Sequence, residues 1–221
     1  MAEFEPVLLA NVGKENSHTL AAYEAAGGYR ALRQVLREKA PGDILNLVRA
    51  SNLRGRGGAG FPTGLKWSFL PEGHPGPIYL CVNADESEPG TFCNRVLMEN
   101  DPHQVLEGTI LSSYATRASV AYIYLRYEYP KSLRRLERAI AECREAGYLG
   151  RNILGSTFSL EITIHRGAAA YICGEETGLI ESLEGRRAWP RIKPPFPAVE
   201  GLFRKPTVVN NVETLACVTH I

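Results

Sequence analysis

The sequence predicts a three-layer α/β domain with a mostly parallel sheet and an N-terminal helical extension. Apolar runs at 78–82, 119–127 and 160–165 have the length and composition of buried strands. A segment with helical spacing of apolar residues follows each of the first two runs, and a further helix is expected from about Gly174. Because strands that alternate with helices pair in parallel through right-handed crossovers, helices are expected on both faces of the sheet.

The first fifty residues are expected to form helices that pack on the core. Apolar residues recur at three-to-four spacing over 20–36, with a break at Gly27 and Gly28. A further helix is expected to run through Arg49, with Asp43 as its cap. We therefore divide the chain into a helical extension, residues 1–50, and an α/β domain, residues 51–221.

Two longer helices are expected inside the α/β domain. Asp101–Ala115 has apolar residues on its inner positions, and Pro130–Gly147 has an apolar face behind a proline that suits a first helical turn. Ligands of parallel sheets bind beyond the carboxyl ends of the strands. The loops that follow the expected strands are therefore the candidate site.

The composition is that of a globular protein without a dominating charge. The 221 residues include 25 Lys plus Arg and 24 Asp plus Glu, which gives a formal net charge of +1. Such a chain has no general field that attracts nucleic acid or an anionic membrane. No apolar run approaches the roughly 20 residues that span a bilayer. We expect no nucleic-acid partner and no direct insertion into a membrane.

The first residues and the cysteines bear on the compartment. Met1–Pro6 has no basic region before an apolar core, so no secretory signal is expected. The five cysteines are an odd number and include no Cys-x-x-Cys pair, which argues against a disulfide framework and against a local zinc or iron–sulfur site. A reducing compartment and no metal in this chain are therefore expected.

The densest motif is a glycine-rich stretch, Arg54–Trp67. Its Gly-x-Gly-x-x-Gly spacing from Gly55 matches a dinucleotide fingerprint, but residues 44–51 before it are expected to be helical where the fingerprint requires a strand. Glycines still let backbone N–H groups approach an anion, and Arg56 and Lys66 supply positive charge. A phosphate or a flavin edge is one expected occupant, and an ordinary surface loop is the alternative. A single Arg-Gly-rich copy argues against an RNA-binding patch.

Polar side chains cluster after the first expected strand, where Asn83, Asp85, Glu86 and Glu88 lie within eight residues. Such groups at the carboxyl end of a strand are placed to accept hydrogen bonds from sugar or polyol hydroxyls. The alternative is a solvated turn that caps a helix.

Small residues follow the third expected strand in Arg166–Thr177, where they permit close backbone approach at a helix N-terminus. Glu175 and Glu176 would also be ordinary first-turn residues, an explanation that leaves the small-residue run unexplained. No histidine within the motif could activate Cys173, so we expect a buried thiol without a catalytic role.

Two later segments could also face a ligand. Lys193–Pro197 is a stiff loop that would present its lysine and phenylalanine outward, or serve only as a structural corner. In Pro206–Thr214, the adjacent amides Asn210 and Asn211 precede an apolar-periodic run, and one of them is expected to cap a helix. Two adjacent amides can also face a heteroaromatic edge.

Taken in order, these five motifs closely resemble the flavin-binding (51 kDa) subunit of respiratory complex I, NADH:quinone oxidoreductase. The diaphorase subunits of NAD-dependent hydrogenases and formate dehydrogenases share the set. The resemblance covers essentially the whole chain and implies a Rossmann-like FMN-binding domain in which NADH stacks on the flavin and gives it a hydride. Electrons would then pass singly to iron–sulfur clusters and on to quinone.

The resemblance also implies the contacts of each group. FMN would contact the glycine loop and the polar groups at the strand ends, namely Gly55, Arg56, Gly57, Gly58, Lys66, Asn83, Asp85, Glu86, Tyr171, Gly174, Glu175, Val209, Asn210, Asn211 and Thr214. NADH would contact Phe61, Phe69, Glu88, Glu176, Lys193 and Phe196. No side chain would act as acid or base, since hydride transfer is the cofactor's own chemistry, and Glu88 and Glu176 would align the reactants.

The family's flavoprotein is longer and continues into a ubiquitin-like domain and a segment that binds a [4Fe–4S] cluster. That cluster is expected outside this chain or in partners, so the isolated chain is expected to lack the first electron acceptor. Cys93 and Asn94 stand where the family usually has Lys and Asp, and Ala169 stands where it usually has Gly.

The implied partners are the thioredoxin-like [2Fe–2S] subunit and an iron–sulfur subunit of a peripheral arm, on the cytoplasmic side of the inner membrane or the matrix side in mitochondria. The alternatives are a diaphorase subunit of a soluble NAD-dependent hydrogenase or formate dehydrogenase, and a nucleotide-binding remnant without catalysis.

Overall fold

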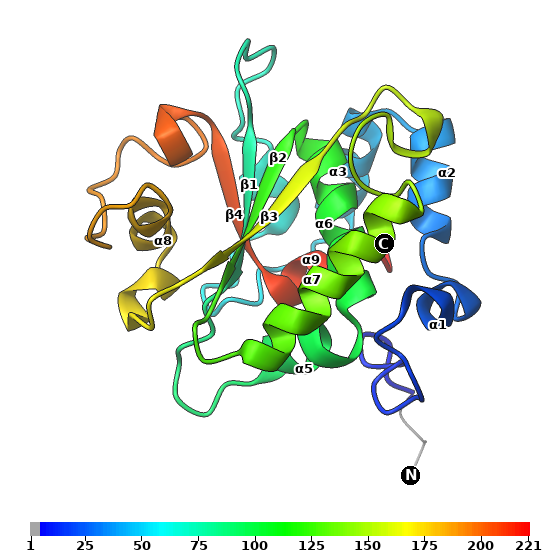
Figure 1. Ribbon diagram of the computed structural model, residues 1–221. Helices are drawn as coiled ribbons and strands as arrows, with labels where there is room; N and C mark the ends of the chain where they lie inside the picture. Colours follow the sequence, from blue (N-terminus) through cyan, green and yellow to red (C-terminus); the bar gives the residue numbers. More distant parts are fainter. Residues whose placement is uncertain (1–4) are drawn as a thin grey trace.

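The computed structural model describes residues 5–221, and its strands form a four-stranded sheet in the order β3-β2-β1-β4 (Figure 1). The strands are β1 (Tyr79–Ala84), β2 (Val120–Leu125), β3 (Glu161–Arg166) and β4 (Thr207–Asn211). Each neighbouring pair is parallel, so the carboxyl ends of these strands meet at one edge of the sheet. The predicted α/β class and the first three predicted strands are confirmed.

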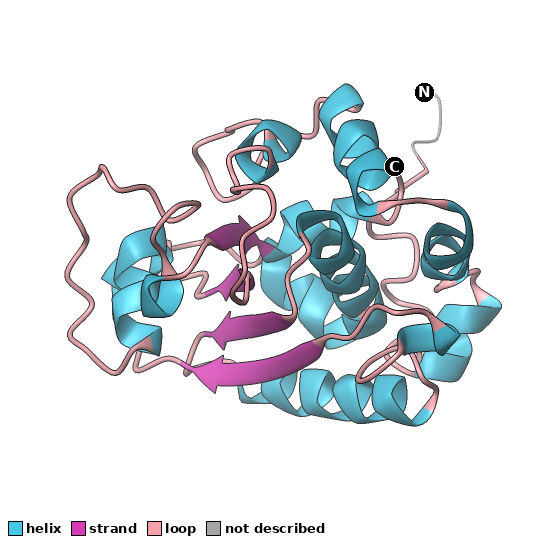
Figure 2. Cartoon of the chain, turned by 90° about the horizontal axis from the view of Figure 1, so that it is seen from above, coloured by secondary structure: helices cyan, strands magenta, loops and turns pink. Residues whose placement is uncertain are grey.

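Helices cover both faces of the sheet, which confirms the three layers (Figure 2). On one face lie α5 (Cys93–Asn100), α6 (Pro102–Thr116), α7 (Pro130–Glu145) and α9 (Val212–Val218). The other face is covered by α8 (Glu176–Leu183) with the 3-10 helices η2 (Tyr171–Gly174) and η3 (Leu202–Arg204). A third 3-10 helix, η1 (Ile153–Gly155), precedes β3. The predicted helix from about Gly174 begins at Glu176, because η2 comes first.

Successive side chains of a strand pack against the helices on opposite faces of the sheet. Leu80 and Val82 of β1 join the large apolar core beneath α6, α7 and α9, whereas Cys81 joins a smaller cluster beneath α8. Cys173 also lies in the smaller cluster and is 2% exposed, so the predicted burial of this thiol is confirmed. The middle of β1 is therefore buried on both faces, as is usual in parallel sheets, whereas the edge strand β3 exposes Glu161 and Thr163.

The prediction for Pro206–Thr214 was incomplete, because Thr207–Asn211 forms strand β4 before the helix begins. Val208 faces the large core and Val209 faces the smaller cluster, so both sides of this strand are buried. Four of its five residues are buried, so the strand has no polar–apolar alternation, and periodicity could not distinguish it from a loop.

The N-terminal helices are α1 (Leu20–Ala25), α2 (Arg30–Glu38) and α3 (Pro41–Ala50), and a short helix α4 (Thr63–Trp67) follows the glycine-rich stretch. The predicted break at Gly27 and Gly28 is confirmed. The prediction that Asp43 caps α3 was wrong, because the helix begins at Pro41 and Asp43 lies in its first turn. There the carboxylate of Asp43 accepts a hydrogen bond from the backbone N–H of Ala40 at 2.8 Å.

Glu107 ties these N-terminal helices to the core. Its carboxylate is 2% exposed and accepts hydrogen bonds from the Tyr23 hydroxyl at 2.5 Å and from the backbone N–H groups of Tyr29 at 2.9 Å and Leu32 at 3.1 Å. A buried carboxylate needs such partners to offset the loss of water. The predicted division at residue 50 remains a prediction. In the described residues, no helix has both the length and the apolar character needed to cross a membrane.

Gly108 of α6 allows the close approach of α9, because a Cβ atom at this position would collide with the carbonyl oxygen of Leu215. We predict that Gly108→Ala lowers the free energy of unfolding by about 2 kcal/mol, as overpacked cores do. The control is Gly42→Ala in α3, where an added Cβ meets open space and alanine should stabilise the helix by up to about 1 kcal/mol. Urea denaturation measures both variants, and equal stability of Gly108→Ala and the unchanged chain would contradict the packing argument.

Candidate functional site

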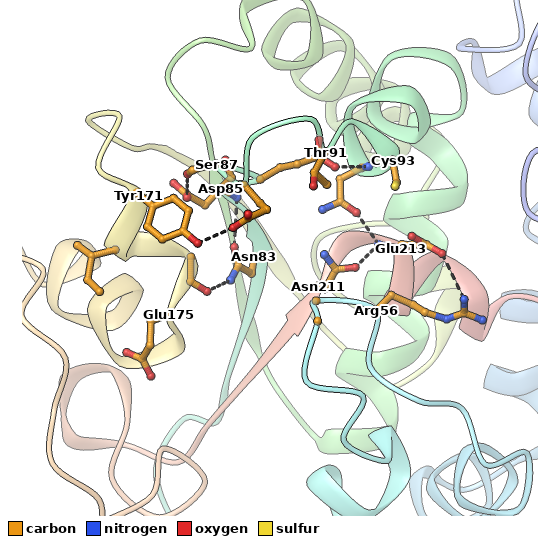
Figure 3. Close-up of a pocket in the computed structure, with 17 residues that line it drawn as sticks. Arg56, Asn83, Asp85, Ser87, Thr91, Cys93, Tyr171, Glu175, Asn211 and Glu213 are labelled. Carbon is orange, nitrogen blue, oxygen red and sulfur yellow. Dashed lines mark hydrogen bonds and ion pairs between the residues drawn. The ribbon is translucent and has the colours of Figure 1, made fainter.

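A cavity of about 540 Å³ lies at the carboxyl ends of β1 and β4 (Figure 3). Its walls come from the glycine-rich loop, the loop after β1, η2 and the first residues of α5 and α9. The lining residues are Arg56, Gly57, Gly58, Asn83, Asp85, Glu86, Ser87, Glu88, Thr91, Cys93, Asn94, Tyr171, Ile172, Gly174, Glu175, Asn211 and Glu213. Both its position and its size are typical of ligand sites in α/β proteins.

The glycine-rich loop is closed on itself and fixed to α9. The backbone N–H of Gly55 donates to the carbonyl of Phe61 at 2.9 Å, and the N–H of Arg56 donates to the Thr214 hydroxyl oxygen at 2.8 Å. A Cβ atom at Gly57 would lie 3.4 Å from Cβ of Asn211. Gly58 has φ +113°, which disfavours residues with a side chain. The loop therefore packs closely against the end of β4, and Gly57 and Gly58 line the cavity.

Asn83 joins the loop after β1 to η2. Its side-chain N–H donates to the carbonyl of Gly174 at 2.9 Å, and its side-chain oxygen accepts from the N–H of Asp85 at 3.2 Å. Asp85 is 1% exposed, and its carboxylate accepts from the Ser87 hydroxyl. Burial raises the pKa of the Asp85 carboxyl above its usual value, although the Ser87 hydrogen bond opposes the shift.

η2 and the start of α8 form the opposite wall. The Tyr171 hydroxyl donates to the Glu88 carboxylate at 2.5 Å, a bond that joins η2 to the loop after β1. Glu175 is the N-cap of α8, where its carboxylate accepts from the N–H groups of Thr177 at 2.8 Å and Gly178 at 2.9 Å. The other carboxylate oxygen of Glu175 lies 3.5 Å from Nζ of Lys193.

Glu176 lies between two lysines. Its carboxylate accepts from Nζ of Lys66 at 2.7 Å and from Nζ of Lys193 at 2.6 Å. Burial alone would raise the pKa of Glu176, but the two ammonium groups lower it below the usual value. The expectation that Lys193 points outward was wrong, because this ion pair turns it towards α8. Lys66 also donates to the carbonyl of Val209 at 2.7 Å and so fixes β4.

The two adjacent amides have different roles. Asn211 is the N-cap of α9, where its side-chain oxygen accepts from the N–H groups of Glu213 at 2.9 Å and Thr214 at 3.3 Å, and it lines the cavity. The side-chain oxygen of Asn210 instead accepts from the buried Trp67 indole N–H at 2.8 Å. Of the two, Asn211 is therefore the cap.

The structure brings most of the predicted flavin residues to one cavity. Eleven of the predicted residues line it: Arg56, Gly57, Gly58, Asn83, Asp85, Glu86, Glu88, Tyr171, Gly174, Glu175 and Asn211. The remaining predicted flavin residues and the lysine–glutamate group are not among the lining residues: Gly55, Lys66, Val209, Asn210, Thr214, Glu176 and Lys193. The three phenylalanines predicted to contact NADH are exposed and also lie off the lining: Phe61, Phe69 and Phe196.

Some lining residues were not predicted: Ser87, Thr91, Cys93, Asn94, Ile172 and Glu213. Ser87 and Ile172 lie inside predicted motifs and could have been included. Cys93 and Asn94 are at the start of α5, a helix that we did not predict from the sequence. No sequence pattern therefore indicated that these two residues would lie beside the cavity. Glu213 resembles an ordinary first-turn residue of α9 and forms an ion pair with Arg56 at 3.7 Å.

The two sides of the cavity differ in chemistry. Arg56 supplies a cationic side chain at the glycine-rich loop, where a phosphate would be attracted. Across the cavity, Asn83 and Asp85 supply oxygen atoms that can accept hydrogen bonds from hydroxyl groups (Figure 3), and Glu88 is a further acceptor in the lining. The arrangement suits a ligand that has both a phosphate and a polyol.

Two relatives of high sequence identity are subunits of NADH-quinone oxidoreductase. The chain is 64% identical over 218 residues to an NADH-quinone oxidoreductase subunit of Rhizobium meliloti, covering 99% of this chain and 52% of that relative. It is 56% identical to the corresponding NADH-quinone oxidoreductase subunit of Aquifex aeolicus, covering 97% of this chain and 50% of the relative. The chain thus spans about half the length of the curated relatives it matches.

Solved structures agree with the sequence comparison. A crystal structure of an NAD⁺-reducing [NiFe]-hydrogenase in the H₂-reduced state superimposes with a TM-score of 0.77 and 44% identity, covering 87% of this chain and 32% of that chain. Residues 48–220 match the family model of the Nuo51 FMN-binding domain. With this match over most of its length, the chain belongs to the Nuo51 FMN-binding domain family.

Proposed function

We propose that the cavity at the ends of β1 and β4 binds FMN, and that NADH binds beside the flavin and reduces it. The observation that supports this function is the convergence of the glycine-rich loop, the loop after β1, η2 and the start of α9 on one cavity of about 540 Å³. These are the motifs in which the sequence resembles flavin-binding subunits, and the family is an FMN-binding domain.

The residues present fit a planar group with a phosphate. An added Cβ at Gly174 would lie 3.7 Å from the Asp85 carboxylate, and one at Gly57 would lie 3.4 Å from Asn211. Both glycines line the cavity, so larger side chains there would take up space that a ring system needs. Arg56 and the neighbouring backbone N–H groups would hold the phosphate, and Asn83 and Asp85 would accept hydrogen bonds from the ribityl hydroxyls.

The protein's contribution to the reaction is alignment. When bound, FMN would supply the chemistry by accepting a hydride from NADH and releasing electrons singly. Phe61 and Phe69, whose ring centroids are 6.1 Å apart, form an exposed aromatic pair that would stack on the adenine. Glu88 and Glu176 would orient NADH, while Lys193 would hold Glu176 in place.

The electron acceptors would lie in other parts of the enzyme. We propose a complex I-like assembly with a thioredoxin-like [2Fe–2S] subunit and an iron–sulfur subunit, in which electrons pass to quinone, at the cytoplasmic or matrix face of the inner membrane. The 64% identity to a subunit named for quinone reduction favours this assembly. A diaphorase of an NAD-dependent hydrogenase is the second candidate, supported by the 44% identity to the hydrogenase structure.

The first prediction of this function is that the chain takes up FMN and that anaerobic NADH bleaches the bound flavin's absorbance. Gly57→Val should abolish FMN uptake, because its side chain would extend from a position already in contact distance of Asn211. Gly42→Val, which adds the same atoms in open space, should retain uptake. Dialysis with FMN followed by visible spectroscopy measures both, and an unchanged chain that binds no FMN would refute the proposal.

The second prediction concerns Asp85, whose raised pKa means that the folded protein disfavours the charged form. The penalty is present above the folded pKa and disappears below the ordinary pKa. Asp85→Asn should therefore raise the free energy of unfolding at neutral pH, and the gain should vanish at about pH 3. The same variant should weaken FMN binding about 10-fold, because an amide oxygen accepts hydrogen bonds less strongly. Urea denaturation at both pH values and FMN titration are the measurements, and a gain in stability that persists in acid would contradict this cause.

The third prediction concerns nucleotide choice. Glu176→Gln would remove the carboxylate that engages Lys66 and Lys193, so both ammonium groups would become available to the 2′-phosphate of NADPH. We expect the ratio of the NADPH to the NADH reduction rate to rise about 10-fold. Glu200→Gln, at an exposed glutamate, should leave the ratio unchanged. A ratio that stays the same in Glu176→Gln would exclude this role.

A further inference from the structure

Glu86 is held by hydrogen bonds from three separate elements. Its carboxylate accepts from the backbone N–H groups of Asn94 at 2.7 Å and Arg95 at 2.9 Å, which are in the first turn of α5. It also accepts from the Tyr129 hydroxyl at 3.0 Å. The backbone carbonyl of Glu86 accepts from the Arg126 guanidinium at 2.9 Å. Glu86 is 9% exposed, so these partners replace the water that the carboxylate would otherwise bind.

The backbone of Glu86 has an unfavourable conformation. Its φ is +37°, in a region that residues with side chains adopt only when their surroundings hold them there. Asp85 before it and Ser87 after it both line the cavity. If the bonds to Glu86 were lost, its φ would relax to a negative value and the neighbouring side chains would turn away from their present positions.

The carboxylate of Glu86 has little capacity left for a ligand. A carboxylate offers about four acceptor positions, and two backbone N–H groups and one hydroxyl occupy three of them. Glu86 therefore contributes to the cavity mainly through its backbone conformation, which orients its neighbours, and less through direct contact with a ligand.

Tyr129 is the side chain that completes this arrangement from outside the cavity. It is 8% exposed, lies at the start of α7 and is not among the lining residues. Two guanidinium groups lie near its ring, that of Arg95 at 5.6 Å and that of Arg126 at 5.8 Å from the ring centroid. Burial, with the adjacent Glu86, raises the pKa of Tyr129 to about 12, so the hydroxyl keeps the proton that it donates.

We infer that Tyr129 is a positioning residue of the flavin site: through its hydroxyl it holds Glu86 in the left-handed conformation that directs Asp85 and Ser87 at the cavity. The inference rests on the proposed function, because the cofactor is what the loop is positioned to bind. Tyr129 itself touches neither flavin nor nucleotide.

The experiment compares Tyr129→Phe with Tyr127→Phe, each of which removes one hydroxyl oxygen. Tyr127 is 52% exposed, two residues earlier in the same loop. Titration of the 221-residue chain with FMN should show about 10-fold weaker binding for Tyr129→Phe, the effect of losing a hydrogen bond to a charged group. Tyr127→Phe should bind FMN as the unchanged chain does. Circular dichroism checks that each variant is folded.

A second measurement separates positioning from a general loss of stability. In the background of Glu86→Ala, which has no carboxylate for the hydroxyl to reach, Tyr129→Phe should cause no further loss of FMN affinity. The absorbance spectrum of bound FMN at saturation should also change in Tyr129→Phe and not in Tyr127→Phe.

The outcomes distinguish this inference from the proposed function. An unchanged chain that binds no FMN refutes the proposed function and, with it, any role of Tyr129 in that function. An unchanged chain that binds FMN, together with Tyr129→Phe binding it equally well, overturns the inference alone. If adding Tyr129→Phe to Glu86→Ala weakens FMN binding by the same factor as Tyr129→Phe alone, the inference is also overturned, because the effect would then not pass through Glu86.

Discussion

Parallel pairing of β1 with both β2 and β4 is the constraint on which the rest of the structure depends. In this register Asn83 lies opposite Asn211, and Ala84 lies opposite Leu125. The start of the loop after β1 and the start of α9 therefore lie side by side at one edge of the sheet. The buried alternation of Leu80 and Val82 against Cys81 fixes that register, since a shift by one residue would turn each side chain to the wrong layer. The apolar core thus determines where the polar cavity lies.

The sequence predicts the layers well because their signals are local. Strand-length apolar runs and helical spacing are properties of neighbouring residues, and the three strands and two long helices expected from them are present. β4 gave no such signal, because it is short and four of its five residues are buried. The start of α3 was misplaced for another reason. Both Pro41 and Asp43 are typical of the beginning of a helix, and the backbone geometry shows that the helix begins at Pro41.

The sequence predicts which motifs form the site, but it does not predict well which of their side chains are available to contact a ligand. Many polar side chains in these motifs are engaged by partners far away in the sequence. Trp67 occupies the oxygen of Asn210, and Lys66 is bound to Glu176, which is 110 residues away. The hydroxyl of Thr214 accepts from the glycine-rich loop. Pairing over such distances depends on the folded topology, so residue patterns identify the neighbourhood and only coordinates identify which groups face a ligand.

The acidic side chains of the cavity have a consequence for the kinetics of ligand entry. The acidic lining residues are Asp85, Glu86, Glu88, Glu175 and Glu213, and the cationic lining residue is Arg56. An incoming dianion is therefore repelled by groups of its own sign in the same cavity that the glycine-rich loop lines. Mobile ions screen such repulsion over about 8 Å at physiological ionic strength. Added salt should thus accelerate the association of a phosphate-bearing ligand, the reverse of the usual behaviour of anion-binding proteins, which attract their ligands over long distances.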